Sequence, residues 1–256
     1  MGDVEQFYDE FLESRMLDYR ISGNLRIDMA TDRILEFVRP DSHVLDVGCG
    51  VGITAERVAN QVETGHVWAF DISKRNIWYA RETIDNPNLT FFAADVADDK
   101  PQIKSQLSAS VDVITLVDVI EHIPKDDHAE LLDFFQAITS EQSFIVLTYP
   151  SPQFQRHLKR NDPEKLQIID QVIDREELVG TAESAGFSLR HYSLETVWKR
   201  NQYVHCVLQA DGTLGTPRTD SSSLLERIQN RLHATWRHRV LHPFRRWKYV
   251  DRVFGD

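Results

Sequence analysis

The sequence has only two cysteines, no long apolar run and no excess of positive charge. Cys49 and Cys206 are too few to form a disulfide framework, which favours a reducing compartment. No apolar stretch approaches the roughly 18 residues of a membrane-spanning helix. The first residues, MGDVEQFYDEFLESR, lack the basic start and apolar centre of a secretory signal peptide. We therefore expect a cytoplasmic protein.

The net charge of −11 is unfavourable for binding nucleic acid through a broad surface, so no nucleic-acid partner is expected. The charge is uneven, however, because the segment from Ser221 onward carries eight Lys and Arg residues against three Asp and Glu residues. With 41% hydrophobic residues, a chain of 256 residues is long enough for one large α/β domain with additions.

Short apolar runs alternate with helix-like segments, which is typical of proteins with buried parallel strands. The runs are HVLDV (43–47), HVWAF (66–70), LTFFA (89–93), VDVITLV (111–117) and SFIVLTY (143–149). Helices are expected at 53–62, 73–84 and 125–138, with Ser73 as an N-cap. Two further runs, 187–197 and 203–209, could add an antiparallel edge. The pattern predicts an α/β fold with a Rossmann-like, seven-stranded, mostly parallel sheet flanked by helices.

A glycine-rich turn follows the first predicted strand, where open α/β sheets bind their ligands. Gly48 and Gly50 let the backbone turn tightly and approach a ligand closely. A dinucleotide fingerprint, G-x-G-x-x-G, would require glycine at position 53, which is Ile. Asp46 lies two residues before the first glycine, where a carboxylate is awkward beside a pyrophosphate. It suits a ligand with an ammonium group instead.

Aspartates also follow the next two predicted strands. Asp71 lies 23 residues after Gly48, as expected for a carboxylate that binds two ribose hydroxyls. Asp95, in FFAADV, could accept a hydrogen bond from an adenine amino group. A ligand with an ammonium group, a ribose and an adenine but no phosphate is S-adenosylmethionine.

With these residues, the chain resembles the class I S-adenosylmethionine-dependent methyltransferases. The matching pieces are VLDVGCGVG (44–52), WAFDIS, AADVAD and the fourth predicted strand leading into DVIEHIP. The resemblance covers roughly Ile27 to Leu208. The residues that it assigns to the cofactor are Asp46, Gly48 and Gly50 at the methionine end, Asp71 at the ribose, Asp95 and Val96 at the adenine, Ile72 on the adenine face, and Cys49 and Val117 beside them.

The segment LVDVIEHIP (116–124) places two carboxylates and an imidazole after the fourth predicted strand. Asp118, Glu121 and His122 would face the transferred methyl group, where an alcohol acceptor must lose its proton. This D-x-x-E-H is similar to the E/D-x-x-E-H motif of ubiquinone-biosynthesis O-methyltransferases and of small-RNA terminal ribose methyltransferases. In both groups the motif is associated with a divalent metal. The resemblance implies a Mg²⁺ or Mn²⁺ site at these residues. His157, which follows the fifth predicted strand, could supply a missing ligand, although a lone histidine in a loop is more often solvated.

Two other interpretations of the motif stay open. His122 could act as a general base without a metal. In many metal-free relatives, an E-H pair caps the helix and shapes the cofactor pocket. The RNA-type motif also adds a histidine three residues on, and position 125 here is Lys.

The acceptor is predicted to be a hydroxyl of a small or saccharide-like molecule, with a ribose 2′-hydroxyl at an RNA end as the alternative. The methyltransferase domain is expected over 27–210, with residues 1–26 as a lid helix and the polar segment 151–174 as a substrate wall. Clustered basic residues in that segment could meet a phosphate or carboxylate on the substrate, or form a solvated face. They are Arg156, His157, Lys159 and Arg160.

The tail, residues 221–256, has an apolar residue at every fourth position of a predicted helix. These residues are Leu224, Ile228, Leu232, Trp236 and Val240. A basic amphipathic helix of this kind could contact an anionic membrane, which here would be the inner membrane face. It could also pack on the acidic main domain or on a second subunit, which would make a homodimer.

Overall fold

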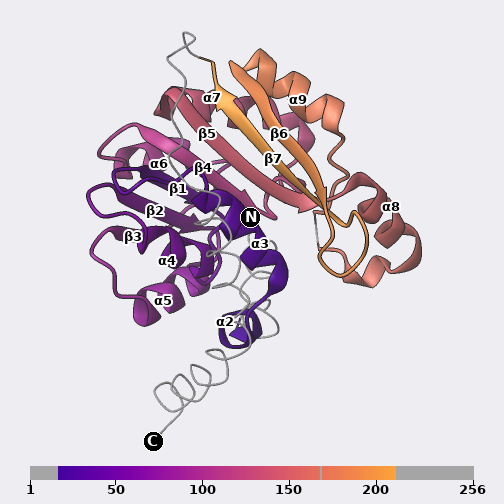
Figure 1. Cartoon of the computed structure of the whole chain (residues 1–256), viewed down its shortest axis with the longest axis horizontal. Helices are drawn as coiled ribbons and strands as arrows, with labels where there is room; N and C mark the ends of the chain where they lie inside the picture. Colours follow the sequence, from indigo (N-terminus) through magenta and orange to yellow (C-terminus); the bar gives the residue numbers. More distant parts are fainter. Residues whose placement is uncertain (1–16, 168, 212–256) are drawn as a thin grey trace, which may run out of the picture.

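The computed structural model describes residues 17–167 and 169–211. In this part of the chain, seven strands form one sheet in the order β3-β2-β1-β4-β5-β7-β6 (Figure 1). The strands are β1 (His43–Val47), β2 (His66–Asp71), β3 (Leu89–Ala93), β4 (Val111–Val117), β5 (Thr139–Pro150), β6 (Phe187–Glu195) and β7 (Tyr203–Ala210). The first five are parallel, and β7 is antiparallel to both of its neighbours. The predicted mostly parallel sheet with an antiparallel edge is confirmed.

Helices cover both faces of this sheet. They are α2 (Leu17–Ser22), α3 (Leu25–Leu35), α4 (Ile53–Ala59), α5 (Lys74–Thr83), α6 (Lys100–Gln106), α7 (His128–Ile138), α8 (Pro152–Asn161) and α9 (Arg175–Ser184), with short 3-10 turns η2 (Ile120–His122), η3 (Lys125–Asp127) and η4 (Pro163–Lys165). One face is packed against α3, α4 and α5, and the other against α6, α7 and α9. Figure 1 shows α8 beyond the ends of β5, β6 and β7.

Alternation along the central strands explains the two cores. Leu45 and Val47 of β1 point to the face that also buries Phe135 of α7. Val44, the residue before Leu45, packs on the opposite face with Ile34 of α3. Because both faces are covered, these strands are apolar at nearly every position, which is why they were readable as continuous apolar runs.

Strand register brings several chain segments to one edge of the sheet. Val117, at the end of β4, pairs with Thr148 near the end of β5. Pro150 in turn pairs with Tyr203, at the start of antiparallel β7. The chain order reverses between β1 and β4, and open α/β sheets bind ligands at such a reversal, outside the carboxyl ends of their strands.

Local signals placed most element starts correctly. Ser73 caps α5 as predicted, because its Oγ accepts a hydrogen bond from the Asn76 amide at 3.0 Å. The helix predicted over 53–62 is shorter, since α4 ends at Ala59. The segment predicted as a helix over 125–138 begins with the 3-10 turn η3, and α7 follows it.

Predictions on the chain ends are only partly covered by the described residues. The proposed lid, 1–26, includes α2 and the start of α3. Its first 16 residues lie outside the described part of the chain. The amphipathic tail, 221–256, also lies outside, so its membrane and dimer contacts stay predictions.

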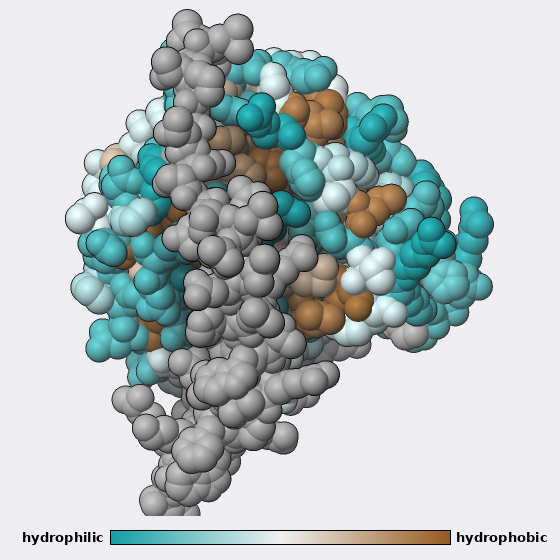
Figure 2. All heavy atoms as spheres, in the orientation of Figure 1, coloured by the Kyte–Doolittle hydropathy of each residue, from teal (hydrophilic) through white to brown (hydrophobic). Residues whose placement is uncertain are grey.

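Among the described helices, none combines the length and apolarity needed to cross a membrane. Figure 2 shows hydrophilic side chains over α8, at the right edge of the view.

Candidate active site

The turn after β1 is a close-packed glycine loop. Gly48, Gly50 and Gly52 all have positive φ, at 69°, 54° and 78°. A Cβ added at Gly48 would lie 2.5 Å from Cγ2 of Val119, in the segment after β4. A side chain at this position would therefore both strain the backbone and collide with the neighbouring segment. The glycines bring the loop against the reversal point of the sheet.

Asp71, the last residue of β2, ties this loop to the neighbouring strand. Its Oδ2 accepts a hydrogen bond from the Gly50 amide at 2.8 Å. Its Oδ1 accepts from the Ser73 amide at 2.9 Å and from the Asn76 side chain at 3.2 Å. Each carboxylate oxygen has two lone pairs, and Oδ1 already accepts two hydrogen bonds, so a ribose hydroxyl would approach Oδ2. Asp71 thus shapes the loop as well as offering the predicted ribose contact.

Asp46 is a buried carboxylate with one oxygen in need of a donor. Its side chain points to the α3–α4 face, where Thr115 of β4 donates a hydrogen bond to Oδ1 at 2.6 Å. Within the described residues, no donor reaches Oδ2. Burial raises the pKa of Asp46 to about 7, against the Thr115 hydrogen bond, and the nearby charge of Asp71 adds to the rise. A ligand ammonium group would satisfy this oxygen and favour its ionised form.

The predicted adenine side lies in the loop after β3. Asp95 is half-buried, and its Oδ1 accepts a hydrogen bond from the Ala97 amide at 2.8 Å, which fixes the turn. Val96 is buried, while Ile72 and Val117 are partly exposed and can offer apolar surface to a ligand. Burial raises the pKa of the Cys49 thiol well above its usual range, which keeps it neutral within the glycine loop.

The buried Glu121 and the partly buried His122 form an acid–base pair in the turn after β4. Glu121 is 2% exposed, and its Oε1 lies 3.8 Å from Nε2 of His122. Burial raises the pKa of Glu121 to about 7, and the neighbouring His122 opposes the rise. The Ile169 carbonyl lies 2.6 Å from Nδ1 of His122. Because a carbonyl only accepts, this contact places the proton of a neutral ring on Nδ1 and leaves the lone pair on Nε2.

Asp118 is held by an ion pair that the sequence did not predict. It adopts φ of 54°, uncommon for a residue other than glycine, and its Oδ2 pairs with Nη1 of Arg26 from α3. The Arg26 guanidinium also lies 5.4 Å from the ring centre of Tyr203, on β7. Three distant segments therefore meet at this end of the site. The charge of Arg26 compensates that of Asp118, whose side chain is only 11% exposed.

Comparison with known families identifies the family of this chain. A family model described as a methyltransferase domain matches residues 19–192. The chain belongs to the class I S-adenosylmethionine-dependent methyltransferases. The predicted methyltransferase class and its dependence on S-adenosylmethionine are thereby confirmed. The aspartates lie near the carboxyl ends of the strands, where open α/β sheets bind their ligands.

Individual relatives of the methyltransferase are distant. The indolepyruvate C-methyltransferase of Streptomyces griseus is 27% identical over 132 residues, which are 50% of this chain and 40% of that protein. The chain spans less than half the length of the curated relatives that it matches.

Solved structures support the fold. An S-adenosylmethionine-dependent methyltransferase from Mesorhizobium loti has a TM-score of 0.60 at 14% identity, covering 74% of this chain and 99% of that one. The magnesium protoporphyrin IX methyltransferase of Synechocystis PCC 6803, with bound S-adenosylmethionine, has a TM-score of 0.58 at 16% identity, covering 81% and 97%.

The predicted metal ligands of the methyltransferase do not converge. Asp118 faces Arg26, and Nδ1 of His122 faces a carbonyl. His157 lies on α8, with its Nε2 4.0 Å from Asp162. Among the described residues, no group of three or more His, Cys, Asp and Glu side chains could hold a metal ion. This set of described donors does not fit a divalent cation, so the structure does not support the predicted metal site.

Several site residues were missed from the sequence. Arg26, Tyr203 and Ile169 reach the motif from α3, β7 and the loop after η4. Asp170 lies near the same pair. Burial raises the pKa of Asp170, and the nearby His122 opposes this rise. None of these residues has a local pattern that signals its role, because the contacts depend on the tertiary fold. Only the length and polarity of segment 151–174 indicated a substrate wall.

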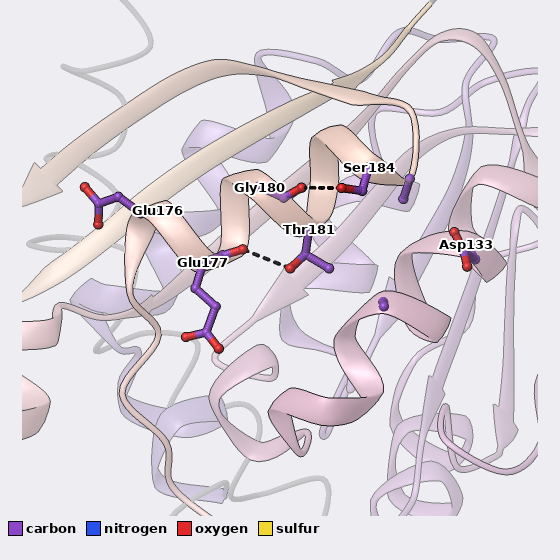
Figure 3. A pocket seen from close by; sticks show the side chains of 8 residues that line it. Asp133, Glu176, Glu177, Gly180, Thr181 and Ser184 are labelled. Carbon is purple, nitrogen blue, oxygen red and sulfur yellow. Dashed lines mark hydrogen bonds between the residues drawn. The ribbon is translucent and has the colours of Figure 1, made fainter.

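A surface groove between α7 and α9 has the wrong character for a cofactor. It encloses about 600 Å³ and contains none of the predicted site residues (Figure 3). Asp133, Glu176 and Glu177 line it together with small side chains. Its exposed acids and short side chains offer neither apolar walls nor positive charge.

Proposed function

We propose that this methyltransferase transfers a methyl group from S-adenosylmethionine to a hydroxyl of a small or saccharide-like acceptor, and that the Glu121–His122 pair takes the proton. One observation carries the proposal: a buried carboxyl group with its pKa raised to about 7 lies beside an imidazole, just after β4. A group of this kind exchanges a proton near neutral pH, as general-base catalysis requires.

The chemistry follows from the orientation of the imidazole. The acceptor oxygen attacks the methyl carbon in line with the sulfonium leaving group, so that an O–C bond forms as the S–C bond breaks. The hydroxyl proton passes to Nε2 of His122, since Nδ1 already faces the Ile169 carbonyl. Glu121, 3.8 Å away, then stabilises the imidazolium by its charge. S-adenosylhomocysteine and the methyl ether leave, and the proton is released to solvent.

The remaining residues of the site bind and orient. Asp46 accepts from the ammonium group of the cofactor, and Asp71 accepts from the ribose hydroxyls. Arg26 holds Asp118 beside the turn that carries the base. Since displacement at a methyl carbon depends on alignment, this fixed frame is a large part of the rate enhancement.

A carbon acceptor next to a carbonyl group is the second candidate. The similarity to an enzyme named indolepyruvate C-methyltransferase favours it. It also requires proton removal, so the same pair would serve. The RNA-end alternative is disfavoured by the net charge of −11, because phosphate backbones bind surfaces rich in Lys and Arg.

Methyl-labelled cofactor provides the test. A cell extract would be separated into small-molecule, protein and RNA pools, and each pool incubated with the full chain and labelled S-adenosylmethionine. We expect label in the small-molecule pool, with the methyl carbon bonded to oxygen by NMR. Label on carbon would favour the second candidate. Label confined to the RNA or protein pool would contradict both.

A further inference from the structure

A second groove lies at the same edge of the sheet as the active site. It encloses about 420 Å³ and is lined by Gln153, Phe154 and His157 of α8 and by Lys199, Arg200 and Asn201 of the loop between β6 and β7. α8 directly follows β5, and the loop precedes Tyr203, which pairs with Pro150. Both walls therefore leave the sheet where β4 delivers the Glu121–His122 pair.

Hydrogen bonds hold the two walls together. Ser151, the N-cap of α8, donates through Oγ to the Asn201 carbonyl at 2.7 Å and through its amide to the Gln202 carbonyl at 2.8 Å. The buried Gln202 side chain accepts from the amides of Trp198 and Lys199, at 3.2 and 3.0 Å. The loop that carries the cationic side chains is thus fixed against α8.

The groove is basic, and no acidic side chain of the described residues lines it. Within the described residues, no ion pair joins Lys199 or Arg200 to an acid, although Asp162 lies 4.0 Å from His157. The Lys199 ammonium instead lies 5.7 Å from the ring centre of Phe154. The other large groove, between α7 and α9, is lined by Asp133, Glu176 and Glu177 and so has the opposite charge. Two exposed cations that no described acid pairs with, beside a ring and in a preformed groove, suit a compact anion.

A chain of contacts connects this groove with the site. The rings of Phe154 and Tyr203 lie 6.3 Å apart. The Tyr203 hydroxyl lies 3.4 Å from Nη1 of Arg26, and the same nitrogen pairs with Asp118. A molecule that follows these side chains from the groove would reach the turn that carries Glu121 and His122.

We infer that the groove formed by α8 and the β6–β7 loop binds a carboxylate or phosphate group of the acceptor, whose other end carries the methylated atom. The inference rests on the proposed function, and it narrows the acceptor from any hydroxyl compound to an anionic one. Lys199 and Arg200 are the residues that select it.

Inorganic phosphate and succinate are suitable probes, because they separate the two anion classes. Each is added to the full chain at constant ionic strength, and backbone amides are followed by NMR. We expect saturable shifts at His157, Lys199 and Arg200, and binding at least tenfold weaker in K199Q/R200Q. The control K104Q/R190Q removes two exposed charges elsewhere and should bind like the wild type. The stronger of the two probes identifies the anion class. Shifts that grow linearly and spread over all exposed cations, or unchanged binding in K199Q/R200Q, would overturn the inference.

Methyl transfer separates this inference from the proposed function. With the anion-exchange-bound fraction of the small-molecule pool as acceptor, K199Q/R200Q should raise the acceptor KM at least tenfold. Its kcat and its S-adenosylmethionine affinity should match those of the control. Label that appears only in uncharged compounds, equally in both variants, would overturn the anion site and leave the methyltransferase assignment intact. Intact cofactor binding without label in any small-molecule fraction would contradict the proposed function instead.

Discussion

Asp71 and Glu121 are both buried carboxyl groups at the carboxyl edge of the sheet, but their surroundings differ. Both oxygens of Asp71 accept hydrogen bonds from the glycine loop and from the start of α5. Oε2 of Glu121 has no donor within the described residues, and burial raises the pKa of its carboxyl group to about 7. A carboxylate with several donors is fixed in its charged form and suits binding, whereas a carboxyl group without them can exchange a proton. The cofactor half is therefore preorganised, and the acceptor half is prepared for proton transfer.

Removing the proposed base should have the largest effect, and it tests the acceptor half of the site. His122→Ala should lower kcat by roughly 10²–10⁴, as loss of a general base does. The cofactor Kd should stay within about twofold, because the cofactor half does not depend on this ring. Steady-state kinetics and calorimetry would measure the two effects. His191→Ala, on β6, is the control. A normal kcat in the variant would show that His122 is not the base and that the E-H pair only caps the helix.

Asp46→Asn should separate stability from binding on the cofactor side. Burial raises the pKa of Asp46 from 3.8 to about 7, so the folded protein holds this proton more tightly than the unfolded chain does. The protonated Asp46 therefore stabilises the folded state fully below a pH of about 4, and this stabilisation is lost as the pH rises to about 7. The variant has no such loss, so at pH 8 it should stabilise the cofactor-free protein by on the order of 4 kcal/mol, and at pH 4 by little.

The same variant should bind S-adenosylmethionine more weakly, because the ligand ammonium group loses its carboxylate. Denaturant titration at pH 4 and pH 8, and calorimetry at pH 8, would measure both effects, with exposed Asp98→Asn as control. Equal stability differences at the two pH values would show that Asp46 is ionised without a ligand.

Asp71→Ala tests the cofactor half through affinity. The variant loses the acceptor for the ribose hydroxyls and releases the Gly50 amide that shapes the loop. We expect S-adenosylmethionine binding at least tenfold weaker, which corresponds to more than about 1.4 kcal/mol. Circular dichroism would verify that the variant is folded, and calorimetry would give the affinity. Wild-type affinity would remove Asp71 from the cofactor site.

The cofactor half was predictable from the sequence because its residues lie next to the strands that position them. Asp46 is the next-to-last residue of the first apolar run, the glycines follow within six residues, and Asp71 directly follows the next run. The sheet and its antiparallel edge were predictable for the same reason, since buried strands need continuous apolar residues.

The acceptor half was not predictable in this way. Arg26 and Asp118 are 92 positions apart, and Tyr203 lies 177 positions from Arg26. His122 meets the carbonyl of residue 169 only because the loop after η4 folds back onto the turn after β4. Motif spacing suggested that Asp118, Glu121 and His122 converge on a cation. Spacing alone cannot predict that Arg26, from α3, forms an ion pair with Asp118 in place of that cation. Such contacts are a property of the packed fold.

The central claim is that the Glu121–His122 pair removes the acceptor proton without a metal, and treatment with chelator tests it most directly. Labelled methyl transfer into the small-molecule pool would be measured for the wild type with EDTA, with EDTA followed by excess Mg²⁺ or Mn²⁺, and for His122→Ala under the same conditions. The account predicts wild-type activity unchanged within about twofold in all conditions, and a variant that neither metal rescues. Wild-type activity that vanishes with EDTA and returns with Mg²⁺ or Mn²⁺ would contradict it.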